Sequence, residues 1–184
     1  SEITKEEYNK FYKDSFYDYE DPLRVIHFST EGAVSYKALL YIPAKAPYNY
    51  YSKNFEKGLK LYTDGVMIMD RCEELLPDCF SFVKGLVDSE LTLNISRETI
   101  QHDRQLKLIA SNLEKKIKSE LLDMLKNDRE NYEKFYGEFG LQLRYGLYSG
   151  WGMNKDLLQD LILFRSVKTE KYVTLREYTE GMAT

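Results

Sequence analysis

The residues best suited to chemistry in this chain lie in the segment Leu93-Asn-Ile-Ser-Arg-Glu-Thr-Ile-Gln101. The segment begins as a short strand, and Ser96 is a natural N-cap for the helix that follows. Arg97 then falls in the first helical turn, where the helix dipole disfavours a cation by about a few tenths of a kcal/mol. An arginine placed there can reach an anion elsewhere and stabilise the charge of a phosphoryl group in transfer. Gln101, four residues on, projects from the same helix face.

The alternative is that Arg97 only pairs with a neighbouring carboxylate. The chain has no GxxxxGK[ST] or GxGxxG loop to hold a nucleotide phosphate, and no GxSxG nucleophile motif. Cys72 and Cys79 have no histidine near them in sequence and match no zinc spacing, so we expect buried hydrophobes rather than nucleophiles. His102 is expected on a solvated helix face. We therefore predict no metal site and no free-standing active site.

Aromatic side chains are the second notable feature, with 16 tyrosines, 9 phenylalanines and 1 tryptophan. Two clusters with polar or charged neighbours occur, at residues 16–20 and at Tyr48, Tyr50 and Tyr51. Such clusters on a surface bind partner chains or unfolded chains. The alternative, equally compatible with the sequence, is that about half of these rings pack back onto a sheet.

Composition limits the class of protein. A chain of 184 residues makes one domain, or one domain and a fragment, and 43% hydrophobic residues suffice for a packed core. No apolar run approaches the roughly 18 residues of a membrane span. A net charge of −4 argues against nucleic acid as a partner. Two cysteines without a disulfide pattern indicate a reducing, cytoplasmic setting.

The elements that must position these residues begin with a helix over residues 5–16, because Thr4 and Glu7 form a capping box. Two antiparallel strands, a surface loop and two strand-like runs are then predicted over residues 24–30, 34–42, 48–58, 59–63 and 66–69. Asp64-Gly65 between the last two runs favours a hairpin, and a single strand bulged at Gly65 is about as compatible with the sequence.

The second half of the chain is predicted to be mainly helical, with helices over residues 70–76, 77–87, 106–125, 132–139 and 156–162. Short strands are expected over residues 91–95, 163–166 and 172–173. Glycines between residues 137 and 152 should loosen the chain. Thr174 and Glu177 form a second capping box for a final helix that stops at Met182.

Strands first and helices later indicate an α+β fold, a mixed sheet with helices packed on it and a helical extension. The last strand and helix have no partners in the remaining sequence. We therefore expect a second small domain to begin near Ile162 and to be truncated. The start at Ser1 also suggests a piece of a longer protein.

Six motifs together resemble the middle segment of the heat-shock protein 90 chaperones, and the bacterial branch is the most similar. They are Tyr19-Glu-Asp-Pro-Leu, His27-Phe-Ser-Thr-Glu-Gly, Ile42-Pro-Ala-Lys-Ala-Pro, Met69-Asp-Arg-Cys-Glu-Glu-Leu-Leu-Pro, Phe82-Val-Lys-Gly-Leu-Val-Asp-Ser and Leu93-Asn-Ile-Ser-Arg-Glu. The resemblance runs from about residue 7 to residue 182. It implies a large αβα domain over 1–127, a helical connector over 128–161 and the start of a truncated αβα domain over 162–184. It also favours one bulged strand over a hairpin at Asp64-Gly65.

The resemblance assigns roles to individual residues. Arg97 matches the family's catalytic-loop arginine, which contacts the γ-phosphate of ATP held in the N-terminal domain, and Gln101 matches the glutamine that accompanies it. Tyr19 stands where many members have tryptophan in a region of client contact. Met67 stands where many have phenylalanine in an apolar patch facing the ATPase domain. The stretch 88–93 is one residue shorter than the usual pattern.

The function implied is the middle segment of an ATP-dependent chaperone. The chain itself should hold no cofactor, because ATP and Mg belong to the parent's N-terminal domain. The expected partners are that domain, unfolded or partly folded clients and a possible co-chaperone, with no nucleic acid or membrane. The parent is expected to be a cytoplasmic homodimer joined through a missing C-terminal domain. The alternative is a pure protein-interaction module for clients or co-chaperones, without a catalytic contribution.

Overall fold

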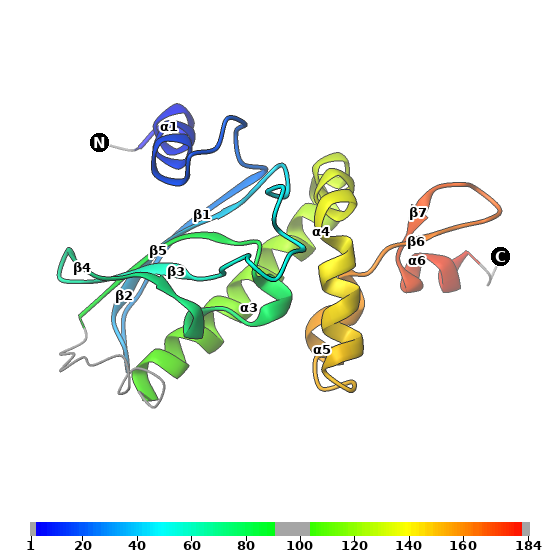
Figure 1. The fold of residues 1–184 in the computed structure, drawn as a ribbon. Coiled ribbons are helices and arrows are strands. Elements are labelled where there is room, and N and C mark those ends of the chain that lie inside the picture. Colours follow the sequence, from blue (N-terminus) through cyan, green and yellow to red (C-terminus); the bar gives the residue numbers. More distant parts are fainter. Residues whose placement is uncertain (1–2, 91–103, 182–184) are drawn as a thin grey trace. The chain divides into compact units, whose positions relative to one another are not determined.

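The structure is a computed structural model that describes residues 3–90 and 104–181. It divides into two units, residues 1–115 and residues 116–184. The first unit holds a five-stranded sheet, and the second is mostly helical (Figure 1).

The first unit opens with helix α1 (Lys5–Phe16), which has the predicted bounds. The Thr4 hydroxyl accepts the Glu7 backbone N–H at 3.3 Å, and the Glu7 carboxylate accepts the Thr4 N–H at 2.7 Å. The capping box is thereby confirmed. The helix ends at Phe16, and the C-cap residue Tyr17 has a left-handed backbone with φ 54°.

The sheet of the first unit has the strand order β1-β2-β5-β3-β4. Its strands are β1 (Arg24–Thr30), β2 (Tyr36–Ile42), β3 (Leu59–Thr63), β4 (Val66–Cys72) and β5 (Lys84–Ser89). Strand β3 runs parallel to β5, and the other neighbouring pairs are antiparallel. This mixed sheet confirms the predicted α+β class.

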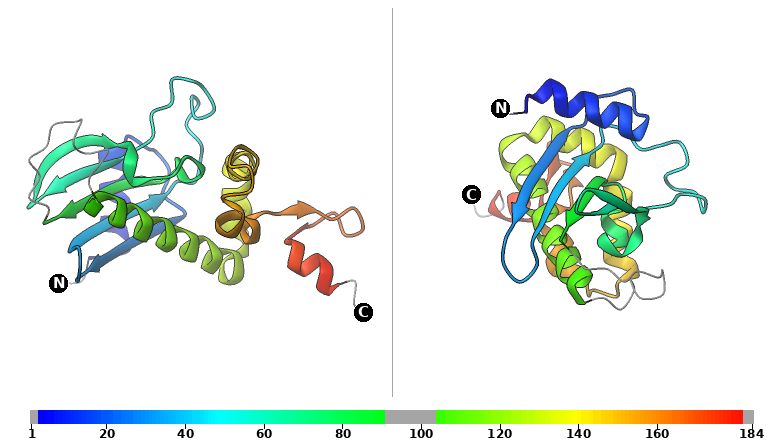
Figure 2. Two further views of the ribbon diagram at one scale, coloured as in Figure 1. Left: turned by 90° about the horizontal axis from the view of Figure 1, so that it is seen from below. Right: turned by 90° about the vertical axis from the view of Figure 1, so that its left-hand side faces the viewer.

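Helices lie on both sides of this sheet, α1 on one side and the first half of α3 (Arg104–Asn127) on the other (Figure 2). The rings of Tyr12 in α1 and Tyr41 in β2 are 4.9 Å apart between centroids. The Tyr41 hydroxyl donates to the backbone oxygen of Tyr8 at 3.2 Å. The core side chains of the other face are fully or almost fully buried and include Ile26, Leu40, Leu61 and Val87, with Leu106, Ile109 and Leu113 of α3.

The single bulged strand favoured by the resemblance is wrong. Strands β3 and β4 are separate and antiparallel, and Asp64-Gly65 forms the turn between them. Both turn residues have positive φ, 50° and 76°, as a two-residue hairpin turn requires. The local hairpin signal was therefore correct, although the pairing also shifts register between Leu59 and Tyr62.

The helices predicted over residues 70–76 and 77–87 are also wrong. Strand β4 extends to Cys72, two short 3₁₀ turns follow (Glu73–Leu75 and Asp78–Phe80), and β5 begins at Lys84. Burial alternates along β5, which is the strand period. A Cβ atom at Gly85 would lie 2.2 Å from the carbonyl oxygen of Leu39 in β2, so the close approach of the two strands requires glycine.

The second unit contains the rest of α3, then α4 (Arg129–Ser149), α5 (Lys155–Leu158), a 3₁₀ turn (Gln159–Leu161), β6 (Phe164–Arg165), β7 (Tyr172–Val173) and α6 (Leu175–Glu180). Strands β6 and β7 pair with each other. The Arg129 guanidinium of α4 contacts the Glu177 carboxylate of α6 at 2.9 Å and the Tyr172 carbonyl oxygen of β7 at 2.8 Å. These bonds fasten the final elements to α4.

The predicted loosening is wrong at Gly137, Gly140 and Gly146, because α4 continues through these three glycines to Ser149, and turns follow only at Gly150 and Gly152. At Gly140 a Cβ would lie 2.8 Å from the Tyr136 ring, so the missing side chain makes room for that ring. The capping box of Thr174 and Glu177 is confirmed, and α6 ends at Glu180. The predicted strand over 91–95 and the end at Met182 lie outside the described residues.

Candidate functional site

The two residues predicted to act on a phosphoryl group, Arg97 and Gln101, lie outside the described residues. The structure does describe where the segment that carries them is attached. On one side it follows Glu90, whose backbone N–H donates to the Ser35 carbonyl oxygen at 3.3 Å. On the other side it precedes Arg104, the first residue of α3. The carrier segment therefore leaves the sheet at the carboxyl end of β5.

The end of the sheet where β5 finishes is also the end where the β3–β4 hairpin turns (Figure 1). Ser89 at the end of β5 pairs with Thr63 at the end of β3. The Gly65 backbone N–H of the turn donates to Asp88 Oδ1 at 3.2 Å. Beyond the turn, β4 begins with the exposed apolar side chains Val66, Met67 and Ile68, which we call the hairpin patch. Met67, 46% exposed, thus lies at the end of the sheet from which the segment with Arg97 departs.

Three of the predicted partner-binding tyrosines are exposed. Tyr19 follows α1 and is 97% exposed; Tyr48 is fully exposed and Tyr51 about half exposed. Tyr19 precedes β1, and Tyr48 and Tyr51 follow β2. Arg24 at the start of β1 pairs with Ile42 at the end of β2. The start of β1 and the end of β2 therefore lie together at one end of the sheet, opposite to the hairpin patch.

Tyr50, predicted to belong to that exposed cluster, is instead buried, with 4% of its surface exposed. Its hydroxyl shares a hydrogen bond with Ser81 Oγ at 2.9 Å, and its ring meets the Phe55 ring edge-on at 4.7 Å. Burial raises the pKa of the Tyr50 phenol. Tyr50 is therefore an anchor for the 48–58 loop, and its neighbours Tyr48 and Tyr51 form the surface.

Asp18 organises the turn that presents Tyr19. Asp18 Oδ1 accepts the backbone N–H of Tyr19 at 2.9 Å, and Oδ2 accepts the Tyr12 hydroxyl at 2.5 Å. The Lys84 ammonium lies 3.4 Å from the same carboxylate. Burial acts to raise the pKa of Asp18, but the hydrogen bond from Tyr12 and the charge of Lys84 outweigh it and lower that pKa below its ordinary value. Asp18 is thus held as a carboxylate.

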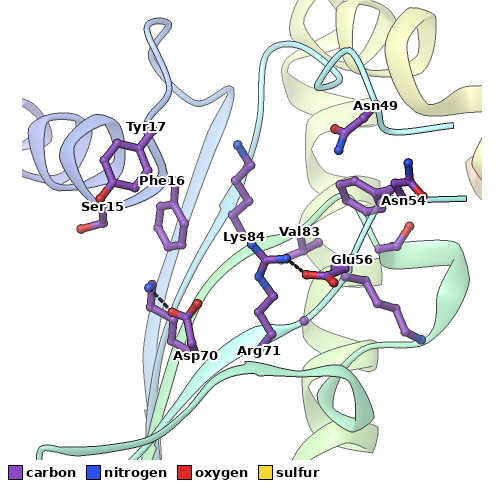
Figure 3. Close-up of a pocket in the computed structure, with 15 residues that line it drawn as sticks. Ser15, Phe16, Tyr17, Asn49, Asn54, Glu56, Asp70, Arg71, Val83 and Lys84 are labelled. Atoms are coloured by element: carbon purple, nitrogen blue, oxygen red, sulfur yellow. Dashed lines mark hydrogen bonds and ion pairs between the residues drawn. The ribbon is translucent and has the colours of Figure 1, made fainter. Parts of the chain in front are cut away.

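A cleft of about 290 Å³ lies beside this turn, between the end of α1, the 49–58 loop and strands β3 to β5 (Figure 3). Two ion pairs form within its lining. Asp70 accepts from Lys60 at 2.6 Å, and this bond lowers the pKa of the Asp70 carboxyl. Arg71 pairs with Glu56, and the two side chains point toward one another across the cleft wall. Two further lysines of the lining, Lys57 and Lys84, pair with Asp78 and Asp18 outside it, and Phe16 and Tyr17 lie at the α1 side of the cleft.

The comparisons with known proteins decide the family. The model of the family described as Hsp90 protein matches residues 1–184, the whole chain. The chain belongs to the Hsp90 family. It is 60% identical over 183 residues to the chaperone protein HtpG of Clostridium acetobutylicum, covering 99% of this chain and 29% of that protein. It is 58% identical to the HtpG of Bacillus subtilis, with the same coverage.

A solved structure supports the same placement within Hsp90. The middle domain of a Plasmodium falciparum heat shock protein superposes with a TM-score of 0.83 at 29% identity, covering 97% of this chain and 70% of that one. This Hsp90 chain spans under a third of the length of the bacterial relatives. It is therefore a segment of an HtpG-type chaperone that matches the middle domain, as the sequence motifs indicated.

The residues that the structure describes in this Hsp90 segment hold neither a metal-binding group nor an activated cysteine. Within residues 3–90 and 104–181 no group of three or more His, Cys, Asp or Glu side chains could hold a metal ion. Burial raises the pKa of both the Cys72 and the Cys79 thiol to about 12, so neither is an activated nucleophile. No described helix is long and apolar enough to cross a bilayer.

Sequence reasoning missed two features of this Hsp90 segment. One is the anchoring role of Asp18, although an aspartate just beyond a helix end and between two tyrosines, Tyr17 and Tyr19, was a usable signal. The other is an exposed aromatic stripe at the end of α4, formed by Tyr145, Tyr148 and Trp151. The spacing of the two tyrosines places them on one helix face, but their exposure depends on which face of α4 packs.

Proposed function

We propose that this segment supplies Arg97 to ATP bound in the N-terminal domain of its parent chaperone. The observation that carries the proposal is the position of the hairpin patch. Met67 and its neighbours lie at the sheet end from which the segment with Arg97 departs. An apolar surface there would seat the nucleotide domain, and the arginine would then arrive beside the nucleotide from the same direction.

The chemistry proposed for Arg97 is electrostatic. Charge spreads over the equatorial oxygens of the γ-phosphoryl group during transfer, and a guanidinium group placed against them lowers the barrier. Gln101 would stand one helical turn away and help to orient Arg97. ATP and its Mg would remain in the N-terminal domain, so this chain would hold no cofactor of its own.

Client contact is proposed for the opposite end of the sheet, at Tyr19, Tyr48 and Tyr51. Strand β5 has six residues and separates the two ends by about 20 Å. The end of the sheet with the exposed tyrosines would therefore hold a client while the opposite end docks on the ATPase domain. Client chains, a possible co-chaperone and a second copy joined through the C-terminal domain complete the proposed partners. Free buried thiols at Cys72 and Cys79 support a reducing, cytoplasmic setting.

The decisive experiment is steady-state ATP hydrolysis by the full-length protein with Arg97→Ala. We expect turnover to fall by about 10³-fold or more if the arginine acts as in other phosphoryl-transfer systems, with nucleotide affinity unchanged. The matched control is Arg176→Ala, which removes the same charge from the exposed surface of α6. Equal turnover of the two variants would reject the catalytic role.

A pure interaction module is the second candidate, and the exposure of Tyr19 and Tyr48 favours it. It predicts that Arg97→Ala leaves turnover intact while Tyr48→Ala weakens the binding of an unfolded client. The two candidates thus make opposite predictions for Arg97→Ala, whereas both predict weaker client binding by Tyr48→Ala.

A further inference from the structure

Two charged depressions on the first unit differ in how their charges are balanced. In the cleft of Figure 3 every lysine and the arginine pair with a carboxylate: Lys60 and Arg71 pair within the lining, and Lys57 and Lys84 pair with Asp78 and Asp18 outside it. The second, which we call the acidic depression, has a volume of about 630 Å³ and lies where β1, β2 and β5 meet the hairpin turn. Its walls carry four carboxylates, at Glu31, Asp64, Asp88 and Glu90.

These four carboxylates are only partly balanced, because a single lysine, Lys37, lies opposite Asp88 in the β2–β5 register. Lys37 is the one cation in the lining, and no ion pair joins any of the four acids to a lysine or arginine in the part of the chain that the structure describes. Asp88 accepts a backbone N–H from Gly65 at 3.2 Å. Four carboxylates against one lysine leave an excess of negative charge, and a cation bound here would relieve the repulsion between the carboxylates.

Buried hydroxyl groups without hydrogen-bond partners are a second, independent observation at the acidic depression. The Ser89 side chain is 1% exposed, Tyr36 is 3% exposed, and both residues line the acidic depression. Neither hydroxyl has a hydrogen-bond partner among residues 3–90 and 104–181. Ser89 pairs in register with Tyr36 on one side and with Thr63 on the other, and the Thr63 hydroxyl is likewise buried and unpartnered. Unsatisfied buried hydroxyls are destabilising, and a row of three is unusual.

The depression therefore offers hydrogen-bond acceptors and excess negative charge. An arginine side chain matches both, because its guanidinium group has five N–H donors in a planar fork, no acceptor and a permanent charge. A metal ion fits less well, because no group of metal-binding side chains gathers among the described residues. Lysine would satisfy fewer of the acceptors at once.

We propose that the acidic depression binds an arginine side chain presented by the nucleotide-binding domain of the same polypeptide. The inference rests on the proposed function, since it supplies the charged half of the docking surface whose apolar half is the hairpin patch. Asp64 joins the two halves, because it lies in the hairpin turn and in the lining of the depression. An apolar centre with complementary charges beside it is the usual composition of a specific interface.

The test uses the full-length protein with fluorophores on the nucleotide domain and on this segment. The approach of the nucleotide domain to this segment, called closing, is measured by energy transfer between the two fluorophores in the presence of a non-hydrolysable ATP analogue. The double variant Glu31→Gln/Glu90→Gln should weaken closing by about threefold to tenfold, as expected for the loss of two exposed charge interactions. The control, Glu73→Gln/Glu180→Gln, makes the same change of net charge away from the depression and should close like the wild type. The difference should shrink when salt is raised from about 0.05 M to about 0.5 M.

A second variant separates the proposal from a general charge effect. Ser89→Ala removes a buried unpartnered hydroxyl without changing charge, so the free energy of unfolding should stay equal or rise. Because the same change removes an acceptor for the arginine, closing should nevertheless weaken by about twofold to fivefold. Closing that is unchanged in both Ser89→Ala and the glutamine double variant would overturn the inference.

The outcomes also separate this inference from the proposed function. If the glutamine variant closes normally while Arg97→Ala abolishes turnover, the arginine-binding depression is rejected and the catalytic role stands. If Arg97→Ala hydrolyses ATP normally, the catalytic role fails whatever the closing measurement shows.

Discussion

The hydroxyl of Tyr12 donates a 2.5 Å hydrogen bond to Oδ2 of Asp18, and this bond joins helix α1 to the turn that exposes Tyr19. Tyr12 is itself fully buried against Tyr41 of the sheet. The position of the candidate client surface is thereby tied to the core of the first unit.

Tyr12→Phe should lower the free energy of unfolding by about 1.5–3 kcal/mol, the usual range for a hydrogen bond to a charged group. The ring remains to fill the core, so the loss reports the hydroxyl alone. Denaturant unfolding followed by fluorescence measures it. Tyr17→Phe is the matched control, because the Tyr17 side chain is largely exposed, and it should be neutral. Equal stability of both variants would contradict the role of the Tyr12–Asp18 bond.

Acid should lower the free energy of unfolding of the first unit by protonating Asp18. The pKa of this carboxyl is lower in the folded chain than in the unfolded chain, so the unfolded state binds its proton first. The stabilisation is complete above the ordinary aspartate pKa of about 3.9 and is lost as pH falls toward the folded value. Unfolding free energies between neutral pH and about pH 3 should show this decline, and Asp18→Asn should flatten it. A decline of equal size in Asp18→Asn would assign the acid sensitivity to other carboxyls.

Gly85→Ala should destabilise the sheet by about 2 kcal/mol or more, because the new Cβ would lie 2.2 Å from the Leu39 carbonyl oxygen and backbone cannot move aside cheaply. Gly137→Ala is the opposite case. It lies within α4 with nothing within 4 Å of the new Cβ, so it should stabilise by about 0.5–1 kcal/mol. Thermal unfolding of the two variants compares them directly. A neutral Gly85→Ala would mean that β2 and β5 are farther apart than described.

Tyr48→Ala and Tyr50→Phe should separate binding from folding. Tyr48 is fully exposed, so its loss should leave stability within about 0.5 kcal/mol and weaken the binding of an unfolded client to the full-length protein. Tyr50→Phe removes the bond to Ser81 and should cost about 1 kcal/mol of stability with client binding preserved. Binding is measured by fluorescence anisotropy of a labelled unfolded protein. The reverse pattern would exchange the roles assigned to the two rings.

Local sequence signals determined the features that depend on a few adjacent residues. The capping boxes at Thr4 and Thr174 set the starts of α1 and α6, because each closes hydrogen bonds within one turn. The Asp64-Gly65 turn was equally local, since both residues adopt positive φ readily, and it outweighed the pattern borrowed from relatives. The six motifs also identified the family, and Arg97 remains a prediction from them.

Tertiary structure decided what depends on neighbours distant in sequence. Strand β5 was mistaken for a helix because its glycine is required by Leu39, more than forty residues earlier in the chain. Tyr50 is buried because Ser81 and Phe55 close around it, whereas Tyr48 two residues away is not. The acidic depression draws its carboxylates from the β1–β2 turn, the hairpin and the end of β5. Only the strand order β1-β2-β5-β3-β4 brings those charges together, because no run of adjacent residues contains all of them.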